Sequence, residues 1–177
     1  ANCMAIAESN ALSADVTADV LCLTYGTCVG GAIVRGGAIY HGTNWSAGEF
    51  GMIYMNGEYY ENIASVTRLV EQAKSMDASL YDGRAITARL NRSDVYALVD
   101  GWAKQVAEGL ASLIHIFNPA CMIIGGGIME NKDVFNMVTS KVSELTAPGF
   151  DVNIRSARFG NSAGLIGAGI LAQKLMK

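Results

Sequence analysis

The sequence predicts an α/β fold built on a mixed five-stranded sheet. Three short apolar segments near the N-terminus, separated by glycine-rich turns, are typical of antiparallel strands joined as a meander. Two later apolar segments lie between long helical patterns, which indicates parallel strands joined through helices. We therefore expect one sheet with an antiparallel half, a parallel half and flanking helices.

The first part of the chain contains the predicted meander. Residues 2–12 are rich in Ala, Met and Ile and are expected to be helical, with a polar break at 15–19. Residues 42–57 show little periodicity and are predicted to form a loop, of a length that often carries function. The expected strands are 20–25, 32–35 and 38–41, with a tight turn at 26–31.

The second part of the chain contains the predicted parallel units. Apolar residues recurring every three or four positions predict a helix at 93–117. Because Gly101 and Gly109 inside it each cost about 1 kcal/mol relative to Ala, we expect both to pack closely against a neighbour. The other expected elements are helices at 61–76, 133–145 and 162–176, strands at 121–124 and 152–157, and a mixed segment at 77–91. This order is that of the ribonuclease H-like domain of actin, heat-shock and hexokinase ATPases, here as a single domain over residues 1–177.

Composition narrows the class of protein. Hydrophobic residues make up 51% and charged residues 16%, which predicts a packed domain with some apolar surface covered by another lobe or subunit. The net charge of −3 gives no sign of the basic patch that nucleic-acid binding usually requires. No apolar run approaches the roughly 20 residues of a membrane span.

The cysteines and the start of the chain bear on its origin. Cys3, Cys22, Cys28 and Cys121 form no C-x-x-C pair, which favours free, buried thiols in a reducing cytoplasm. The chain opens at Ala1 directly on a helical segment, with neither an initiator Met nor a signal peptide. We interpret it as a cytoplasmic fragment of a longer protein.

Two glycine-rich segments are candidate binding sites. Residues 26–31 join two predicted strands, and they are either a hairpin turn or a backbone cradle for an anion, to which Thr27 adds a hydroxyl. Residues 125–127 follow a buried strand and precede a helix, and they are either a flexible connection or a wall against a nucleotide. The residues alone leave both alternatives open.

Two carboxylates are candidate ligands for sugar hydroxyls. Glu49 lies between small residues in the predicted loop, and Glu61 begins a predicted helix. An exposed loop carboxylate is usually only solvated, however, and the helix dipole favours an acid at a helix start in any case. Neither residue is decisive alone.

Taken in order, these segments resemble the ROK family (repressor, open reading frame, kinase) over essentially the whole chain. The helix that begins Ala1-Asn2-Cys3 is similar to the helix after the family's D-A-N segment. Residues 25–32 resemble its G-T-G-I-G-G-G phosphate turn, and residues 47–51 match A-G-E-x-G. Glu61 with Ala64-Ser65 resembles E-x-x-A-S, residues 118–127 resemble N-P-x-x-I-x-x-G-G-G, and residues 164–169 match the closing helix.

The resemblance implies ATP-dependent phosphorylation of a sugar hydroxyl, with Mg²⁺ bridging the phosphates. The chain would be the C-terminal lobe of a two-lobe kinase, without its N-terminal lobe. The family's catalytic base, an Asp, would lie just before Ala1, so we expect no catalytic residue in the chain and no activity from it alone. The resemblance assigns sugar contacts to Asn2, Glu49 and Glu61, phosphate contacts to Gly26 and Thr27, and adenosine packing to Gly126 and Gly127.

The sequence also departs from the ROK pattern. Met52 replaces the His that follows the A-G-E-x-G motif, and no cysteine lies between Gly51 and Glu61, so we expect a variant without the family's zinc site or any other structural metal. Cys28 and Ala32 replace glycines of the phosphate turn. A side chain at Cys28 would resist a positive φ angle, which bears on the geometry of that turn.

Three functions are compatible with these observations. The leading one is a kinase for a hexose, an N-acetylhexosamine or a glucoside, and the second is the sugar-sensing domain of a ROK-type transcriptional repressor. The third is a non-catalytic nucleotide-binding scaffold. The expected partners are the sugar, ATP, the N-terminal lobe and a second copy in a homodimer, since the helix at 93–117 has a wide apolar face. No membrane partner is expected, and nucleic acid is expected only for a repressor.

Overall fold

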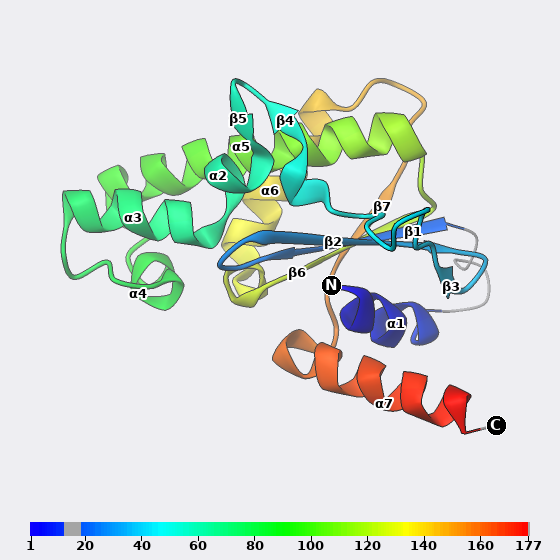
Figure 1. Ribbon diagram of the computed structural model, residues 1–177. Helices are drawn as coiled ribbons and strands as arrows, with labels where there is room; N and C mark the ends of the chain where they lie inside the picture. The colour runs from blue at the N-terminus through cyan, green and yellow to red at the C-terminus, as the bar shows by residue number, and fades with distance from the viewer. Residues whose placement is uncertain (13–18, 177) are drawn as a thin grey trace.

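The computed structural model describes residues 1–12 and 19–176 and contains the expected mixed sheet (Figure 1). Its strands are β1 (Asp19–Tyr25), β2 (Val29–Arg35), β3 (Ala38–Ile39), β6 (Cys121–Gly125) and β7 (Asn153–Ser156), in the order β3-β2-β1-β6-β7. β1, β2 and β3 pair antiparallel, whereas β6 runs parallel to β1 and β7 runs parallel to β6. The predicted class and sheet are confirmed. Of the predicted polar break, only Asp19 is among the described residues, and it begins β1.

Helices cover both faces of the sheet. They are α1 (Asn2–Asn10), α2 (Tyr60–Ala64), α3 (Val66–Met76), α4 (Gly83–Thr87), α5 (Ser93–Phe117), α6 (Lys132–Leu145) and α7 (Ala163–Leu175). Because successive side chains of a strand point to opposite faces, Leu21, Leu23 and Tyr25 of β1 enter one core, while Val20 and Cys22 enter the other. Figure 1 shows α1 and α7 together on one side of the sheet and α5 on the opposite side.

The longest helix, α5, is largely buried within the chain. Its Gly109 packs closely, as predicted, because a Cβ there would lie 2.3 Å from the Cζ atom of Tyr60. The same prediction is wrong for Gly101, where a Cβ would have no described atom within 4 Å. The wide apolar face that suggested a dimer therefore faces the internal core for most of its length. Within residues 1–12 and 19–176, no helix is both long and apolar enough to cross a membrane.

The predicted loop at 42–57 contains regular structure that we did not expect. A 3₁₀ turn, η2 (Phe50–Met52), is followed by a hairpin of β4 (Tyr54–Met55) and β5 (Glu58–Tyr59). Asn56 and Gly57 form its turn with φ angles of 54° and 85°. An Asn-Gly pair is a strong hairpin signal, so the sequence did contain this information.

The predicted helix at 61–76 is broken into α2 and α3. Ser65 between them has extended backbone angles, and its hydroxyl accepts a hydrogen bond from the backbone N–H of Arg68 at 3.3 Å. Ser65 thus caps the start of α3. The break separates Glu61, on the short α2, from the longer helix that follows.

The first and last helices of the chain are bound to each other and to the loop that follows β7. A Cβ at Gly167 of α7 would lie 1.7 Å from the Cys3 carbonyl oxygen, so only glycine permits this approach. The buried Glu8 carboxylate, 3% exposed, accepts backbone N–H bonds from Arg158 and Phe159 at 3.0 and 2.9 Å. α1 is therefore held by backbone contacts at its start and by a buried carboxylate at its end.

Candidate functional site

The two glycine-rich segments meet at one end of the sheet. Because β1 and β6 are parallel neighbours, with Thr24 opposite Gly125, their carboxyl ends lie side by side. A cavity of about 490 Å³ opens there, and we name it the glycine cavity. It is lined by Met4, Thr24, Tyr25, Gly26, Thr27, Cys28, Gly30, Gly125, Gly126, Gly127, Ala157, Gly160, Ala163 and Gly164. The structure therefore brings Gly26, Thr27, Gly126 and Gly127 together.

The glycines that line this cavity lack a side chain for different structural reasons. Gly126 has a φ of 112°, and a Cβ there would lie 2.0 Å from the Tyr25 carbonyl oxygen, so the two strand ends approach too closely for any side chain. A Cβ added at Gly26 or at Gly127 would meet no described atom within 4 Å. Their lack of a side chain leaves bare backbone at the cavity rather than relieving a contact.

The turn after β1 is shorter than predicted. It comprises only Gly26, Thr27 and Cys28, because β2 already begins at Val29. Cys28 is not among the described non-glycine residues with positive φ, so its side chain imposes none of the strain that we expected. Cys28 is exposed rather than buried, unlike Cys22 and Cys121, and the expectation of a buried thiol is wrong here.

A second cavity, of about 300 Å³, adjoins the first. It shares Tyr25, Gly26 and Gly127 with the glycine cavity and adds Val66, Asp82, Gly83, Arg84, Thr87, Ile128 and Glu130. We name it the α4 cavity. Sequence reasoning missed the contribution of α4, because the segment at 77–91 shows no periodicity or motif that points to a site.

A third cavity, of about 400 Å³, contains Glu61. Thr27 and Cys28 line it from the turn, Glu61, Asn62 and Arg68 line it from α2 and α3, and Glu58, Ser65, Thr67 and Glu71 complete it. We name it the acidic cavity. Because Thr27 and Cys28 line both this cavity and the glycine cavity, the predicted sugar ligand Glu61 lies next to the predicted phosphate turn.

The other two predicted sugar ligands, Glu49 and Asn2, line none of the three cavities. Glu49 is exposed at the start of η2, and a Cβ at Gly51, two residues later, would lie 3.0 Å from the Glu61 Oε2 atom. Asn2 is exposed in the first turn of α1. The neighbouring Ala1 lies beside Gly30 of β2, which lines the glycine cavity, since a Cβ at Gly30 would be 3.5 Å from its methyl group.

Comparison with known proteins identifies the family. The ROK family matches residues 1–175. The chain belongs to the ROK family. Among its ROK relatives, the β-glucoside kinase of Listeria innocua is 30% identical, covering 95% of this chain and 61% of that protein. The glucokinase of Halalkalibacterium halodurans is 31% identical, with coverages of 98% and 62%. The chain thus spans about three fifths of the length of these relatives.

Solved structures support the same assignment. The ROK hexokinase from Thermus thermophilus superposes with a TM-score of 0.86 at 28% identity, covering all of this chain and 66% of that one. A ROK glucokinase from Streptomyces griseus, solved with glucose and AMPPNP, gives 0.82 at 26% identity, with coverages of 98% and 66%. A ROK transcriptional regulator, a homolog of the E. coli MLC protein, gives 0.83 at 22% identity and shares the fold.

In this ROK chain, the segment at the position of the family's zinc loop forms the β4–β5 hairpin. The segment between Gly51 and Glu61 contains neither Cys nor His. Across residues 1–12 and 19–176, no three His, Cys, Asp or Glu side chains gather closely enough to hold a metal ion. The predicted lack of structural zinc remains a prediction.

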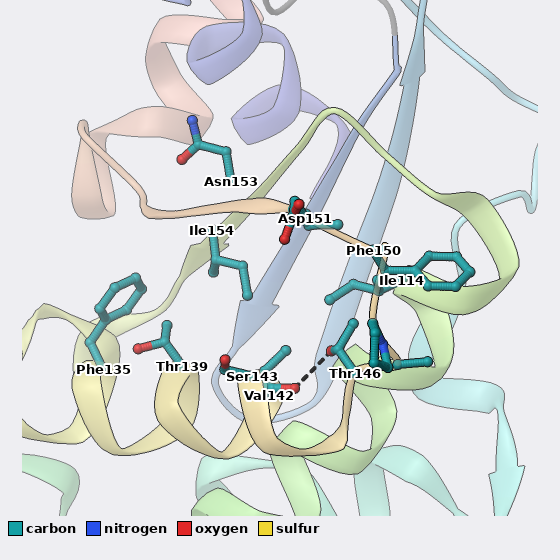
Figure 2. Close-up of a pocket in the computed structure, with 14 residues that line it drawn as sticks. Ile114, Phe135, Thr139, Val142, Ser143, Thr146, Phe150, Asp151, Asn153 and Ile154 are labelled. Carbon is teal, nitrogen blue, oxygen red and sulfur yellow. Dashed lines mark hydrogen bonds between the residues drawn. The ribbon is translucent and has the colours of Figure 1, made fainter.

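A larger cavity of the ROK chain lies away from the predicted residues. Its volume is about 760 Å³, and it lies between β7, α6, Ile114 of α5 and the loop that joins α6 to β7 (Figure 2). In Figure 2, Thr139 and Ser143 of α6 face Ile154 of β7. It shares no lining residue with the glycine, α4 or acidic cavities. We therefore build the candidate site on those three smaller cavities.

Proposed function

We propose that this ROK chain is the C-terminal lobe of a two-lobe sugar kinase that transfers phosphate from ATP to a sugar hydroxyl. The observation that carries the proposal is the meeting of both glycine-rich segments in one cavity, next to the cavity that contains Glu61. Phosphoryl transfer depends mainly on positioning and on neutralising charge. Bare backbone on one side suits the positioning of the phosphates, and a carboxylate on the other suits the positioning of a sugar hydroxyl, while Mg²⁺ would offset the phosphate charge.

The nucleotide would occupy the glycine cavity and the α4 cavity. The phosphates would lie against Gly26 and Thr27, where the exposed Thr27 offers its hydroxyl, whereas the Gly26 N–H already donates to the Cys28 carbonyl oxygen at 3.1 Å. The base and ribose would lie against Gly126 and Gly127, where no side chain projects. Magnesium bound to the phosphates would neutralise charge, and it usually keeps several waters with few protein ligands. The glycine cavity would offer such a metal the hydroxyls of Thr24 and Thr27, and the adjoining α4 cavity would add the carboxylates of Asp82 and Glu130.

The sugar would bind between Asn2, Glu49 and Glu61. Carboxylates and an amide suit hydroxyl recognition, and each charge-assisted hydrogen bond contributes about 1.5–3 kcal/mol. The base would be an Asp just before Ala1, and the position of Ala1 beside Gly30 supports this, since it brings the start of α1 to the edge of the glycine cavity. The N-terminal lobe would close the site, so the chain alone should give no sugar-dependent turnover.

A coupled ADP-release assay tests this proposal. The intact two-lobe protein would be supplied with Mg-ATP and, separately, glucose, an N-acetylhexosamine and a β-glucoside. We expect turnover with at least one of them, and Glu49→Ala should raise the KM for that sugar about tenfold or more, with a smaller effect on the KM for ATP. Glu144→Ala, on the exposed face of α6, is the matched control. Absence of sugar-dependent ATP consumption would refute the proposed kinase function.

The second candidate is the sensor domain of a sugar-responsive repressor, because a ROK regulator shares this fold. The two functions separate clearly in experiment. A repressor would bind the sugar without consuming ATP, and the polypeptide upstream of the lobe would bind DNA. Sugar-dependent ATP consumption would also eliminate a non-catalytic nucleotide-binding scaffold. The cytoplasm as the site of action remains part of our proposal, supported by the free state of all four cysteines.

A further inference from the structure

Three buried aromatic residues join the two halves of the candidate site. Tyr25 ends β1, Tyr60 begins α2, and Trp102 belongs to α5. The Tyr25 ring lies edge-on to both of the others, with centroid distances of 6.4 Å. Tyr25 and Tyr60 are completely buried, and Trp102 is almost so. Tyr25 immediately precedes Gly26, and Tyr60 immediately precedes Glu61.

The directions of the hydroxyl hydrogen bonds follow from their acceptors. The Tyr60 hydroxyl lies 2.7 Å from the Val106 carbonyl oxygen, which can only accept, so Tyr60 donates to it. The two tyrosine hydroxyls are 2.8 Å apart, and with the Tyr60 proton already used, Tyr25 must donate to Tyr60. Burial raises the pKa of both tyrosines well above its ordinary value, so both hydroxyls keep their protons near neutral pH.

The helix α2 is held by α5 at both of its ends. At its start, the Tyr60 ring lies against Gly109, whose missing side chain makes the room, and its hydroxyl reaches Val106. Just after its end, the Trp102 indole N–H donates to the carbonyl oxygens of Ala64 and Ser65 at 3.1 and 3.2 Å. A five-residue helix has little stability of its own. These contacts therefore fix where α2, and with it Glu61, lies.

The phosphate turn is bound to the same element. The Gly26 carbonyl oxygen accepts a hydrogen bond from the backbone N–H of Val66 at 2.9 Å and approaches that of Thr67 at 3.4 Å. Both donors lie in the first turn of α3, directly after α2. A shift of α2 relative to β1 would therefore stretch the bonds that hold Gly26.

We infer that Tyr60 is a positioning residue that, through its hydrogen bonds to Tyr25 and Val106, sets the distance between Glu61 and the phosphate turn. The inference rests on the proposed function, because it supposes that the sugar hydroxyl and the transferred phosphate must meet between these elements. Tyr60 touches neither substrate. It acts by fixing the relative position of Glu61 and the phosphate turn, which would contact the substrates.

Tyr60→Phe tests the inference with the smallest possible change. The ring still fills the space beside Gly109, but Tyr25 loses its acceptor and Val106 loses its donor. Because a displacement of about 1 Å can cost a factor of about 100 in rate, we expect kcat to fall about tenfold or more. The KM values for sugar and ATP should stay within about twofold, since each half of the site is intact.

Two controls separate positioning from general destabilisation. Tyr25→Phe breaks the link to β1 but keeps the Tyr60–Val106 bond, so it should lower kcat by a smaller factor. Val138→Ala removes buried volume from α6, away from the site, and should leave kcat unchanged at a temperature where all variants are folded. A Val138→Ala variant that loses kcat as much as Tyr60→Phe would overturn the inference.

Amide hydrogen exchange provides a readout that does not depend on phosphoryl transfer. In Tyr60→Phe, the Val66 and Thr67 amides should exchange about tenfold faster than in the wild type, while amides of α6 should not change. Unchanged exchange at Val66 and Thr67 would overturn the inference whether or not the protein is a kinase. Faster exchange with unchanged kcat in an active enzyme would overturn it as well. A wild type without turnover would instead refute the proposed function.

Discussion

Gly126 and Gly127 are neighbours in the chain, yet we expect opposite consequences when each is replaced by Ala. A Cβ at Gly126 would lie 2.0 Å from the carbonyl oxygen of Tyr25 and 2.9 Å from its carbonyl carbon, which are backbone atoms of a central strand. A Cβ at Gly127 would meet no described atom within 4 Å. The first methyl group would therefore disturb the fold, whereas the second would project into the glycine and α4 cavities.

The expected magnitudes follow from these contacts. Forcing Ala to a φ of 112° costs about 1–3 kcal/mol and overpacking costs about 1–3 kcal/mol more, so Gly126→Ala should lose about 2–6 kcal/mol of stability. For a domain of this size that corresponds to a fall in Tm of about 5–20 °C. Gly127→Ala should change stability by less than about 1 kcal/mol. It should nevertheless weaken nucleotide binding about 5- to 100-fold, equivalent to about 1–3 kcal/mol of steric cost.

Thermal unfolding followed by circular dichroism, and titration with a fluorescent ATP analogue, measure the two effects separately. We expect Gly126→Ala to be defective mainly in thermal unfolding, and Gly127→Ala to be defective only in nucleotide binding. A Gly126→Ala variant as stable as the wild type would show that β1 and β6 do not meet as described. Unchanged nucleotide affinity in Gly127→Ala would remove the adenosine side of the proposed site.

Four further predictions concern other parts of the molecule. Glu8→Ala should lose about 1–3 kcal/mol in urea unfolding, because the partly buried backbone N–H groups of Arg158 and Phe159 lose their carboxylate acceptor. Hydrogen bonds from Arg92 and, to a lesser extent, Ser79 lower the pKa of Asp77. The ionised Asp77 therefore stabilises the fold at neutral pH, and this stabilisation is lost as the pH falls below about 4. The destabilisation caused by Arg92→Gln should shrink over the same pH range. Elemental analysis of tag-free protein should find no stoichiometric zinc. Light scattering at tens of micromolar tests the predicted dimer: because most of the apolar face of α5 packs into the internal core, the dimer would need other surfaces, and a monomer would contradict the prediction.

The sheet could be predicted because its strands carry their own local signals. In β1 and β6 nearly every residue is apolar, as expected of strands buried on both faces, and turn residues bound each of them. The family motifs then placed four glycine-segment residues at one site, and the structure brings all four to the glycine cavity. The family resemblance was needed here, because the residues alone leave the role of each turn open and it is the parallel pairing of β1 with β6 that carries both turns to the same edge.

Other features could not be predicted because they depend on contacts between distant segments. The break at Ser65 looks like uninterrupted helix in sequence. Ser65 caps α3 locally, but the bonds from Trp102 to Ala64 and Ser65, and from Val66 to Gly26, join distant segments. The contribution of α4 to a cavity likewise depends on the packing of residues 83–87 beside Gly127. Gly101 and Gly109 are alike in sequence, and only the position of Tyr60 distinguishes them.

The contrast between Gly109 and Gly126 shows how such long-range contacts shape the site. Gly126 lets the carboxyl ends of β1 and β6 meet, and Gly109 lets Tyr60 approach α5, so each glycine permits one approach that any side chain would block. Both approaches end at Tyr25, whose backbone contacts Gly126 and whose hydroxyl binds Tyr60. The relative position of the proposed nucleotide and sugar groups is therefore determined largely by a buried cluster around Tyr60, which itself lines none of the three cavities. It follows that substitutions in this buried cluster should alter catalysis more than binding, whereas substitutions at Gly127 or Glu49 should alter binding first.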